Sequence, residues 1–394
     1  MNGAVAAPAG RPAPGRMRWA LMFGNFVMGC GVMVTAGTLN DLSDSLQVSV
    51  AAAGQLIAVA AATMALAAPL LAGWVAAFDR RRLLAFALLW YGAGHGLSAL
   101  MPDYASLWPM RAVTMLAAAV FTPQAGAAIG HLAPPHERGR AITFIFLGWS
   151  LASVIGLPLS AWIGDTLGWR AAFAAIGGLS IAAAVWVYRV MPDGVRPAAL
   201  SLRAWKAVFT SPVLMAIVLV TALSGAGQFT IFSYITPYYK QVLGVGTAQI
   251  SMLLVCFGTF GLIGNVVLTR VIDRVGANAA VATSLALIAV SLLLWPLGVG
   301  VLSTALILVP WGLGGFASNS TQQARLGMAA PALAPALLAL NTSAIYVGQA
   351  VGAGSGGWLI ARHGFGPLHW FGFGWLVVAL GLSLWAGRRT VALA

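Results

Sequence analysis

Charge is scarce in this sequence. Only 7% of its 394 residues are charged, and eight of those are acidic, whereas roughly a quarter of the residues in soluble domains are charged. A water-soluble surface is therefore excluded. The hydrophobic residues make up 60% of the chain and gather in runs long enough to cross about 30 Å of hydrocarbon as helices of roughly 20 residues. The chain is predicted to span a lipid bilayer several times.

Cysteine is also scarce. Cys30 and Cys256 both fall inside apolar runs, so a disulfide framework is implausible and both are interpreted as packing residues. The apolar runs do not alternate with polar residues, which excludes transmembrane strands. The sequence shows no nucleotide-binding loop, no metal-ligand cluster and no nucleophile with its base. We therefore expect no cofactor, no metal and no enzymatic activity.

Twelve apolar runs stand out by hydropathy. The longest connector between them follows the sixth run, so an all-α membrane fold of twelve transmembrane helices in two six-helix bundles is predicted. The small-residue, Pro-rich start of the chain is expected to be a disordered tail. The runs are 17–39, 51–76, 83–101, 106–130, 141–163, 169–190, 213–236, 248–270, 277–299, 303–325, 334–360 and 367–387, and the predicted parts are 1–16 (tail), 17–190 (bundle), 191–212 (linker), 213–387 (bundle) and 388–394 (tail).

The basic residues predict the orientation. With both termini in the cytoplasm, 17 of the 21 Lys and Arg residues lie in inside connectors or tails, as the positive-inside rule requires. The net charge of +13 then reflects topology, and no nucleic-acid partner is expected. Arg111, Arg170, Lys240 and Arg362 are assigned to the outside. The inside set is Arg11, Arg16, Arg18, Arg80, Arg81, Arg82, Arg138, Arg140, Arg189, Arg196, Arg203, Lys206, Arg270, Arg274, Arg325, Arg388 and Arg389.

Four segments carry a family resemblance. The connector GWVAAFDRRR at 73–82 resembles the G-x-x-x-D-R-x-G-R-R signature of the major facilitator superfamily, and TRVIDRVGAN at 269–278 echoes it in the second half. The stretches GWSLASVIGLPLSAWIGDTLGWRAAF at 148–173 and QARLGMAAPALAPALLALNTSAIYVGQAVGAGSGG at 323–357 resemble the drug/proton antiporter branch, in particular sugar-efflux permeases. The resemblance implies the major facilitator fold, with a small-molecule site between the bundles. We expect a monomer.

The resemblance assigns gating roles to residues at helix ends and helix contacts. Gly156 and Pro158 are expected to bend the fifth helix and let a neighbour rock against it, although ordinary close packing is an alternative. The glycines of the eleventh run, from Gly348 to Gly357, suit tight packing on its symmetry mate or sliding. The gating set is Gly73, Asp79, Arg80, Arg81, Arg111, Gly156, Pro158, Asp273 and Arg274.

The first signature departs from the family pattern. Ala77 stands where the family has an aspartate, which the resemblance implies helps to close the cytoplasmic side. Asp79 either replaces that charge or pairs in solvent with a following arginine, an interaction worth about 0–1 kcal/mol; we favour the solvated pair. Removing Asp273 is then expected to impair transport more than removing Asp79.

A second departure concerns energy coupling. Val32 stands where many relatives have an acidic residue midway along the first helix, and all eight acids lie at helix ends or in connectors. His95 is the ionisable residue at mid-depth, and such residues are functional candidates, although a neutral histidine bonded to a carbonyl is the alternative. Asp41, at the outer end of the first run, is the other candidate for proton coupling.

The remaining polar and aromatic residues inside the runs are uncharged. Each of them either bonds to a neighbouring helix or lines a substrate site. As a group they suit a neutral or amphipathic solute such as a sugar, nucleoside or drug. The candidate binding residues are Asn25, Gln124, Trp149, Gln228, Trp311, Asn319, Gln322, Asn341, Tyr346 and Gln349.

The sequence leaves three functional classes open. Secondary active efflux by proton antiport in the inner membrane is the leading hypothesis. An uncoupled facilitator or importer is the alternative, favoured by the missing carboxylate. A sensor or scaffold would carry an added soluble domain, and no connector is long enough for one.

Overall fold

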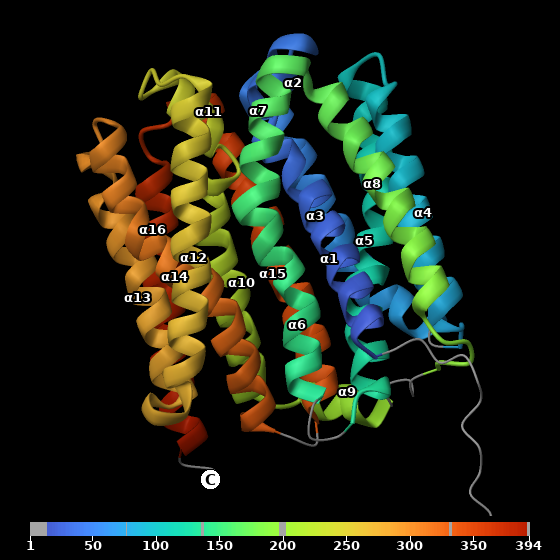
Figure 1. Cartoon of the computed structure of the whole chain (residues 1–394). Helices are drawn as coiled ribbons and strands as arrows, with labels where there is room; N and C mark the ends of the chain where they lie inside the picture. The colour runs from blue at the N-terminus through green and yellow to red at the C-terminus, as the bar shows by residue number, and fades with distance from the viewer. Residues whose placement is uncertain (1–13, 76, 135–137, 197–201, 331–332, 392–394) are drawn as a thin grey trace, which may run out of the picture.

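The computed structural model describes residues 14–75, 77–134, 138–196, 202–330 and 333–391, and the regular structure in these ranges is entirely helical (Figure 1). The predicted all-α class is therefore confirmed. Twelve long helical segments cross the molecule roughly in parallel (Figure 1). Eleven of the described segments are long and apolar enough to span a membrane. The twelfth, α4, opens on three arginines, which lower its hydropathy.

The helices are referred to as an N-half and a C-half. The N-half consists of α1 (Pro14–Gly37), α2 (Leu39–Ser45), α3 (Val50–Val75), α4 (Arg80–Ala99), α5 (Tyr104–Leu132), α6 (Arg138–Leu151), the π-helical turn η2 (Ala152–Gly156), α7 (Leu157–Leu167) and α8 (Trp169–Val190). After α9 (Leu202–Phe209), the C-half consists of α10 (Pro212–Phe232), α11 (Ile235–Gln241), α12 (Thr247–Val275), α13 (Ala277–Leu294), η3 (Trp295–Leu297), α14 (Val301–Ala329), α15 (Ala334–His363) and α16 (Leu368–Val391).

Aspartates begin two of the N-half helices. Asp79 accepts the backbone N–H groups of Arg81 and Arg82 at the start of α4, and Asp103 accepts that of Ser106 at the start of α5. Such caps satisfy donors that have no partner within the helix. Around Asp103, which lies in a connector, the hydrogen bonds from the Ser106 backbone and hydroxyl hold the pKa of the carboxyl below its ordinary value.

The fifth run folds as α6, η2 and α7. The π-turn ends at Gly156, and Pro158 follows in the first turn of α7; π-turns inside α-helices commonly mark functional positions. Gly156 also packs on Cys30 of α1, where an added Cβ would collide with the thiol. The structure thus shows an irregular helix and close packing in this segment, while the rocking of a neighbouring helix stays a prediction.

Three glycines of the eleventh run pack on α10, within the C-half. Cβ atoms added at Gly348, Gly352 or Gly356 would meet the backbone of α10 at less than 3.0 Å. The spacing of four residues puts these glycines on one helix face, and that face lies on α10. These three glycines are therefore tightly packed, as one interpretation expects, but their partner is α10; sliding stays a prediction.

The two halves meet at the end of the bundle opposite the helix ends Pro14 and Val391, near α2 and α11 (Figure 1). This end is called the closed end, and the other is called the termini end. The Thr236 hydroxyl donates to the Ala36 carbonyl at 2.8 Å, and the Thr247 hydroxyl donates to the Asp165 carboxylate. Lys240 lies 4.0 Å from Asp44. These contacts join the α10–α12 region to α1, α2 and α7.

Candidate functional site

A cavity of about 500 Å³ lies between the halves. Residues of α1, α5, α6 and η2 line one wall, and residues of α10, α12, α13, α14 and α15 line the other. Asn319 lines the cavity and is nevertheless exposed to solvent. Since Asn319 lies in the half of α14 nearer the termini end, the cavity extends from the middle of the bundle toward that end. None of the described residues that line it is charged.

The cavity brings together most of the candidate binding residues. Those that line it are Trp149, Gln228, Trp311, Asn319, Gln322, Tyr346 and Gln349. Tyr346, on α15, is 6% exposed and packs with the apolar cluster of the N-half. Its phenol ring therefore bridges the two halves beside the cavity.

Three candidates lie away from the cavity lining, and each is buried. Asn25 donates to the Ile145 carbonyl at 3.1 Å and accepts the Thr122 hydroxyl at 3.0 Å. Asn341 accepts the Thr221 hydroxyl at 2.6 Å, and Gln124 is 8% exposed within α5. The expectation that Asn341 faces the cavity is wrong, because its amide oxygen holds α15 to α10. Asn25 likewise holds α1 to α5 and α6.

His95 and Arg111 lie together in the interior of the N-half. The Arg111 guanidinium donates to the Val32 carbonyl at 3.0 Å and lies 3.3 Å from His95 Nε2. Because a guanidinium only donates, Nε2 accepts, and Nδ1 then donates to the Tyr91 carbonyl at 3.0 Å. Arg111, which was assigned to the outside, is instead 1% exposed in the interior of the N-half, on α5.

Val32 occupies the position where the resemblance implies an acidic residue midway along the first helix. Its side chain lines the cavity, while its carbonyl accepts the hydrogen bond from Arg111. The wall of the cavity is thus apolar where relatives are expected to carry a carboxylate. The buried guanidinium behind that wall is bonded to backbone and imidazole.

Asp41 lies at the closed end. Its Oδ2 accepts the Trp169 backbone N–H at 2.5 Å, at the start of α8. It also lines a second cavity, of about 70 Å³, to which Thr236 and Lys240 of the C-half contribute. This carboxylate therefore faces the other half of the molecule in this conformation.

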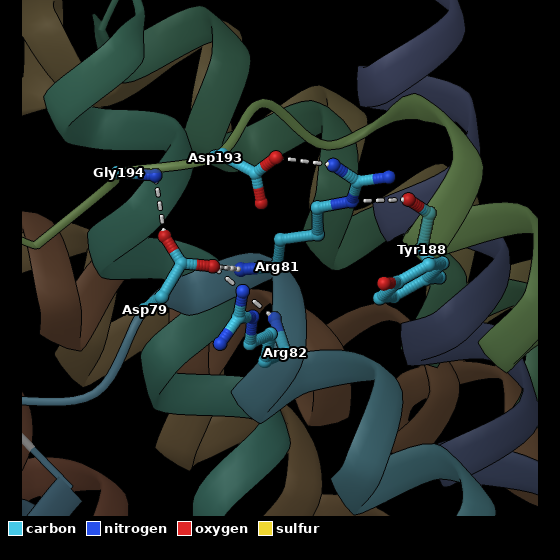
Figure 2. Close-up of polar contacts among 6 residues, drawn as sticks. All are labelled: Asp79, Arg81, Arg82, Tyr188, Asp193 and Gly194. Atoms are coloured by element: carbon cyan, nitrogen blue, oxygen red, sulfur yellow. Dashed lines mark hydrogen bonds and ion pairs between the residues drawn. The ribbon is translucent and has the colours of Figure 1, made fainter.

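The gating candidates of the first signature form contacts within the N-half (Figure 2). Asp79 accepts the Gly194 backbone N–H at 2.5 Å in addition to its cap on α4. Arg81 pairs with Asp193 at 2.6 Å, donates to the Tyr188 carbonyl and lies 4.4 Å above the Tyr188 ring. The favoured solvated pair is thus wrong for Arg81, because its side chain has a different carboxylate partner.

The other gating candidates take varied positions. Arg80 is 2% exposed and donates to the Val75 and Phe78 carbonyls at 3.0 and 2.7 Å, and Arg274 is exposed at the end of α12. Gly73 and Asp273 lie in α3 and α12, but their side-chain positions are outside the described residues.

The aromatic residues deep in the cavity were missed by the sequence analysis. Phe229, Phe232, Phe257 and Phe316 line it beside Trp311. Phe229 and Phe232 are three residues apart on α10 and therefore share a helix face. That spacing is a signal in the sequence, but in a helix that is apolar all round it does not distinguish a cavity from lipid.

A cavity between two halves that meet at one end defines the class of α-helical membrane transporters with a central site. The sequence model of the Major Facilitator Superfamily matches residues 21–353. The chain belongs to this family, whose members and structural neighbours are transporters, and it is a multi-pass inner-membrane transporter. The resemblance stated from the sequence motifs is confirmed.

Individual relatives agree with this assignment. The chain is 30% identical over 344 residues to the inner membrane transport protein YdhP of Escherichia coli K12, covering 87% of this chain and 88% of that protein. It is 27% identical over 354 residues to a probable sugar efflux transporter of Mannheimia succiniciproducens, covering 89% of each. A bacterial homologue of the human lysosomal transporter Spinster, crystallised in an inward-facing, unoccupied conformation, superposes with a TM-score of 0.75 at 15% identity, covering 98% of this chain and 99% of that chain.

Proposed function

We propose that this transporter exports a small neutral or amphipathic organic solute, such as a sugar, nucleoside or drug, by proton antiport with alternating access. The observation that carries the solute class is the central cavity, whose described lining residues are uncharged. A charged solute would lose its hydration there without gaining a countercharge, which is costly in a medium of low dielectric constant. The relative named as a probable sugar efflux transporter supports the direction.

The proposed orientation places the termini end in the cytoplasm, because the basic residues gather in the connectors and tails of that end. With this orientation the cavity leads to the cytoplasm, and the conformation is inward-facing. The domain division proposed above assigns 17–190 and 213–387 to two bundles that rock about the cavity, and 191–212 to the linker between them. The tails are 1–16 and 388–394.

An uncoupled facilitator or importer is the second candidate. The observation that favours it is Val32, an apolar residue in the cavity wall where the resemblance implies a proton-binding acid. Without a group that binds and releases a proton, the solute gradient alone sets the direction of flux.

Counterflow in proteoliposomes tests both candidates. Arabinose, uridine and chloramphenicol represent the neutral sugar, nucleoside and drug classes, and each is assayed with and without an imposed pH gradient. The antiporter predicts that the gradient drives uphill movement of at least one probe, while the facilitator predicts counterflow that is independent of the gradient. Empty liposomes provide the baseline, and the absence of counterflow for all three probes contradicts both candidates.

A further inference from the structure

The deep end of the central cavity is an aromatic surface. It consists of Phe229, Phe232, Phe257, Trp311 and Phe316, which are called the aromatic floor. The ring centroids of Phe257 lie 5.4 Å from Phe232, 5.5 Å from Trp311 and 6.0 Å from Phe316. These tilted and edge-to-face arrangements are the ones that aromatic rings prefer. The three helices α10, α12 and α14 thus present one connected set of rings to the cavity.

Gln228, beside the floor, and Ser318, between the floor and the mouth, are already bonded to the protein. Gln228 accepts the Trp311 indole N–H at 3.1 Å, and its own amide donates to the Ser224 hydroxyl at 3.2 Å. The Ser318 hydroxyl donates to the Gly315 carbonyl at 2.7 Å. A solute at this depth therefore meets ring faces and edges much more than available hydrogen-bonding groups.

Amide side chains gather nearer the mouth of the cavity. Asn265, Asn319, Gln322 and Gln323 line it there and are called the amide rim. With a rise of 1.5 Å per residue, Gln323 lies about 18 Å beyond Trp311 along α14 toward the termini end. By the same measure, Asn265 lies about 12 Å beyond Phe257 along α12. The C-half wall therefore changes from aromatic to amide along the length of the cavity.

The opposite wall does not repeat this change. Ile142, Phe146, Leu147 and Trp149 of α6, with Met33 of α1, line the N-half side. Thr122, Ser150 and Ser153 add hydroxyl groups to this side, which is otherwise apolar. A solute in the cavity is consequently flanked by mostly apolar groups on one long side, faces rings at its inner end, and meets most of the amides at its outer end. Gln228 and Gln349 are the amides that line the cavity nearer the floor.

We infer that the substrate is a neutral amphiphile with an aromatic body, which binds ring first on the aromatic floor and directs its hydrogen-bonding end toward the amide rim. The inference rests on the proposed transport function and narrows its solute class. A bare sugar is disfavoured, because hydroxyl groups facing the floor would lose water without gaining partners. An aromatic ring gains contacts with the faces and edges of the floor.

Matched glucosides separate the contributions of ring and sugar. Phenyl, hexyl and methyl β-glucoside are each titrated against the full chain in lipid nanodiscs, and binding is followed by ligand-observed saturation-transfer NMR with empty nanodiscs as the partition control. Phenyl β-glucoside is expected to bind at least about tenfold more tightly than methyl β-glucoside and more tightly than hexyl β-glucoside. Its phenyl protons should receive more saturation than its sugar protons.

The variant Phe316→Leu removes one ring of the floor while keeping an apolar side chain of similar length. It is expected to reduce the preference for the phenyl compound to threefold or less. Phe86→Leu is the matched control, because Phe86 lies 59% exposed on α4 outside the cavity, and it should keep the full preference. The thermal unfolding temperature of both variants checks that they fold.

Three results would overturn the inference: equal binding of the phenyl and methyl compounds, equal or tighter binding of the hexyl compound, or an unchanged preference in folded Phe316→Leu. None of them depends on transport. Counterflow of arabinose, uridine and chloramphenicol decides the transport function separately, so a failure of the ring preference is distinguishable from a failure of the proposed function.

Discussion

Polar side chains on the long helices of this transporter do two different things. Asn341 joins α15 to α10 through the Thr221 hydroxyl, whereas Asn319 lines the cavity at an exposed position on α14. Interhelical hydrogen bonds in membranes contribute about 0.6 kcal/mol each on average. The same residue type therefore contributes to stability at one position and is available to a solute at the other.

The pair provides a prediction at the residue scale. Asn341→Ala is expected to lower the free energy of unfolding by about 0.6 kcal/mol and to leave the affinity for phenyl β-glucoside unchanged. Asn319→Ala should weaken that affinity severalfold at unchanged stability, because it removes an amide of the rim. Thermal unfolding and the NMR titration measure the two effects. Weaker binding of phenyl β-glucoside to Asn341→Ala would contradict this prediction and show that Asn341 contributes to the binding site.

The sequence could predict which residues are polar within the runs, but not which face of a helix they occupy. The hydrophobic pattern carries no such signal when a helix is apolar on both its lipid and its protein side. Asn25 and Asn341 were misplaced for this reason. Trp311 and Tyr346 were candidates because they are polar or aromatic residues inside the runs, and the structure places both at the cavity.

At the scale of elements, Asp79 connects α4 to the segment that follows α8. Its carboxylate accepts N–H groups from Arg81, Arg82 and Gly194 (Figure 2). Asp79→Ala is expected to lower the free energy of unfolding by about 1 kcal/mol, since N-cap substitutions by alanine cost 0.5–2 kcal/mol. Asp79→Asn should retain most of the stability, because asparagine is an equally good N-cap.

This capping role changes how the gate is tested. Asp273→Ala is still expected to impair transport more than Asp79→Ala, but the comparison holds only when each rate is divided by the amount of folded protein. The counterflow assay with matched amounts of folded transporter provides that measurement. A larger loss of transport per folded molecule in Asp79→Ala than in Asp273→Ala would contradict this expectation. It would show that the first signature, despite Ala77, closes the cytoplasmic side.

Hydropathy predicted the twelve long segments, with ends that differ from the structure by a few residues. It did not predict α2, α9 and α11, which are seven or eight residues long; helices this short draw their stability from packing at their ends and on neighbours. The π-turn at 152–156 was anticipated only as a bend at Gly156 and Pro158. Local sequence indicates that a helix is interrupted, while the tertiary contacts decide the form of the interruption.

At the scale of the whole molecule, the closed end sets the conformational state. Thr247 donates to Asp165 across the halves, and Thr236 donates to the Ala36 carbonyl. Gly258 of α12 packs on η2, where an added Cβ would lie 2.8 Å from the Val154 Cα. Opening this end separates these contacts, so their strength determines the balance between the two states.

Thr247→Val removes one of the hydrogen bonds at nearly constant side-chain volume. A net contribution of about 1 kcal/mol corresponds to a shift of roughly fivefold toward the conformation that is open at the closed end. Spin labels at Thr166→Cys and Ala248→Cys in a background without Cys30 and Cys256 report the distance across this end. Thr166→Val is the matched control, because the Thr166 hydroxyl bonds within its own helix. In this variant the label at 166 is moved to a neighbouring position, and the distance distribution should stay unchanged by the substitution.

Proton coupling requires a group whose surroundings differ between the two conformations. Asp41 meets this requirement, because it lines the small cavity at the closed end together with Thr236 and Lys240 of the C-half, and separation of the halves exposes it to water. His95 is enclosed by α1, α4 and α5 of the N-half, which are expected to move as one body. Its surroundings should therefore change much less during transport.

In proteoliposomes, an imposed pH gradient is expected to drive uphill movement of whichever probe shows counterflow. Asp41→Asn should abolish most of the uphill movement while leaving downhill exchange, since the amide keeps a hydrogen-bond acceptor for the Trp169 N–H but does not titrate. His95→Gln should have the smaller effect. The reverse order would assign coupling to the histidine and its Arg111 neighbour. Robust downhill exchange with no uphill movement at any pH gradient would contradict antiport and leave the facilitator.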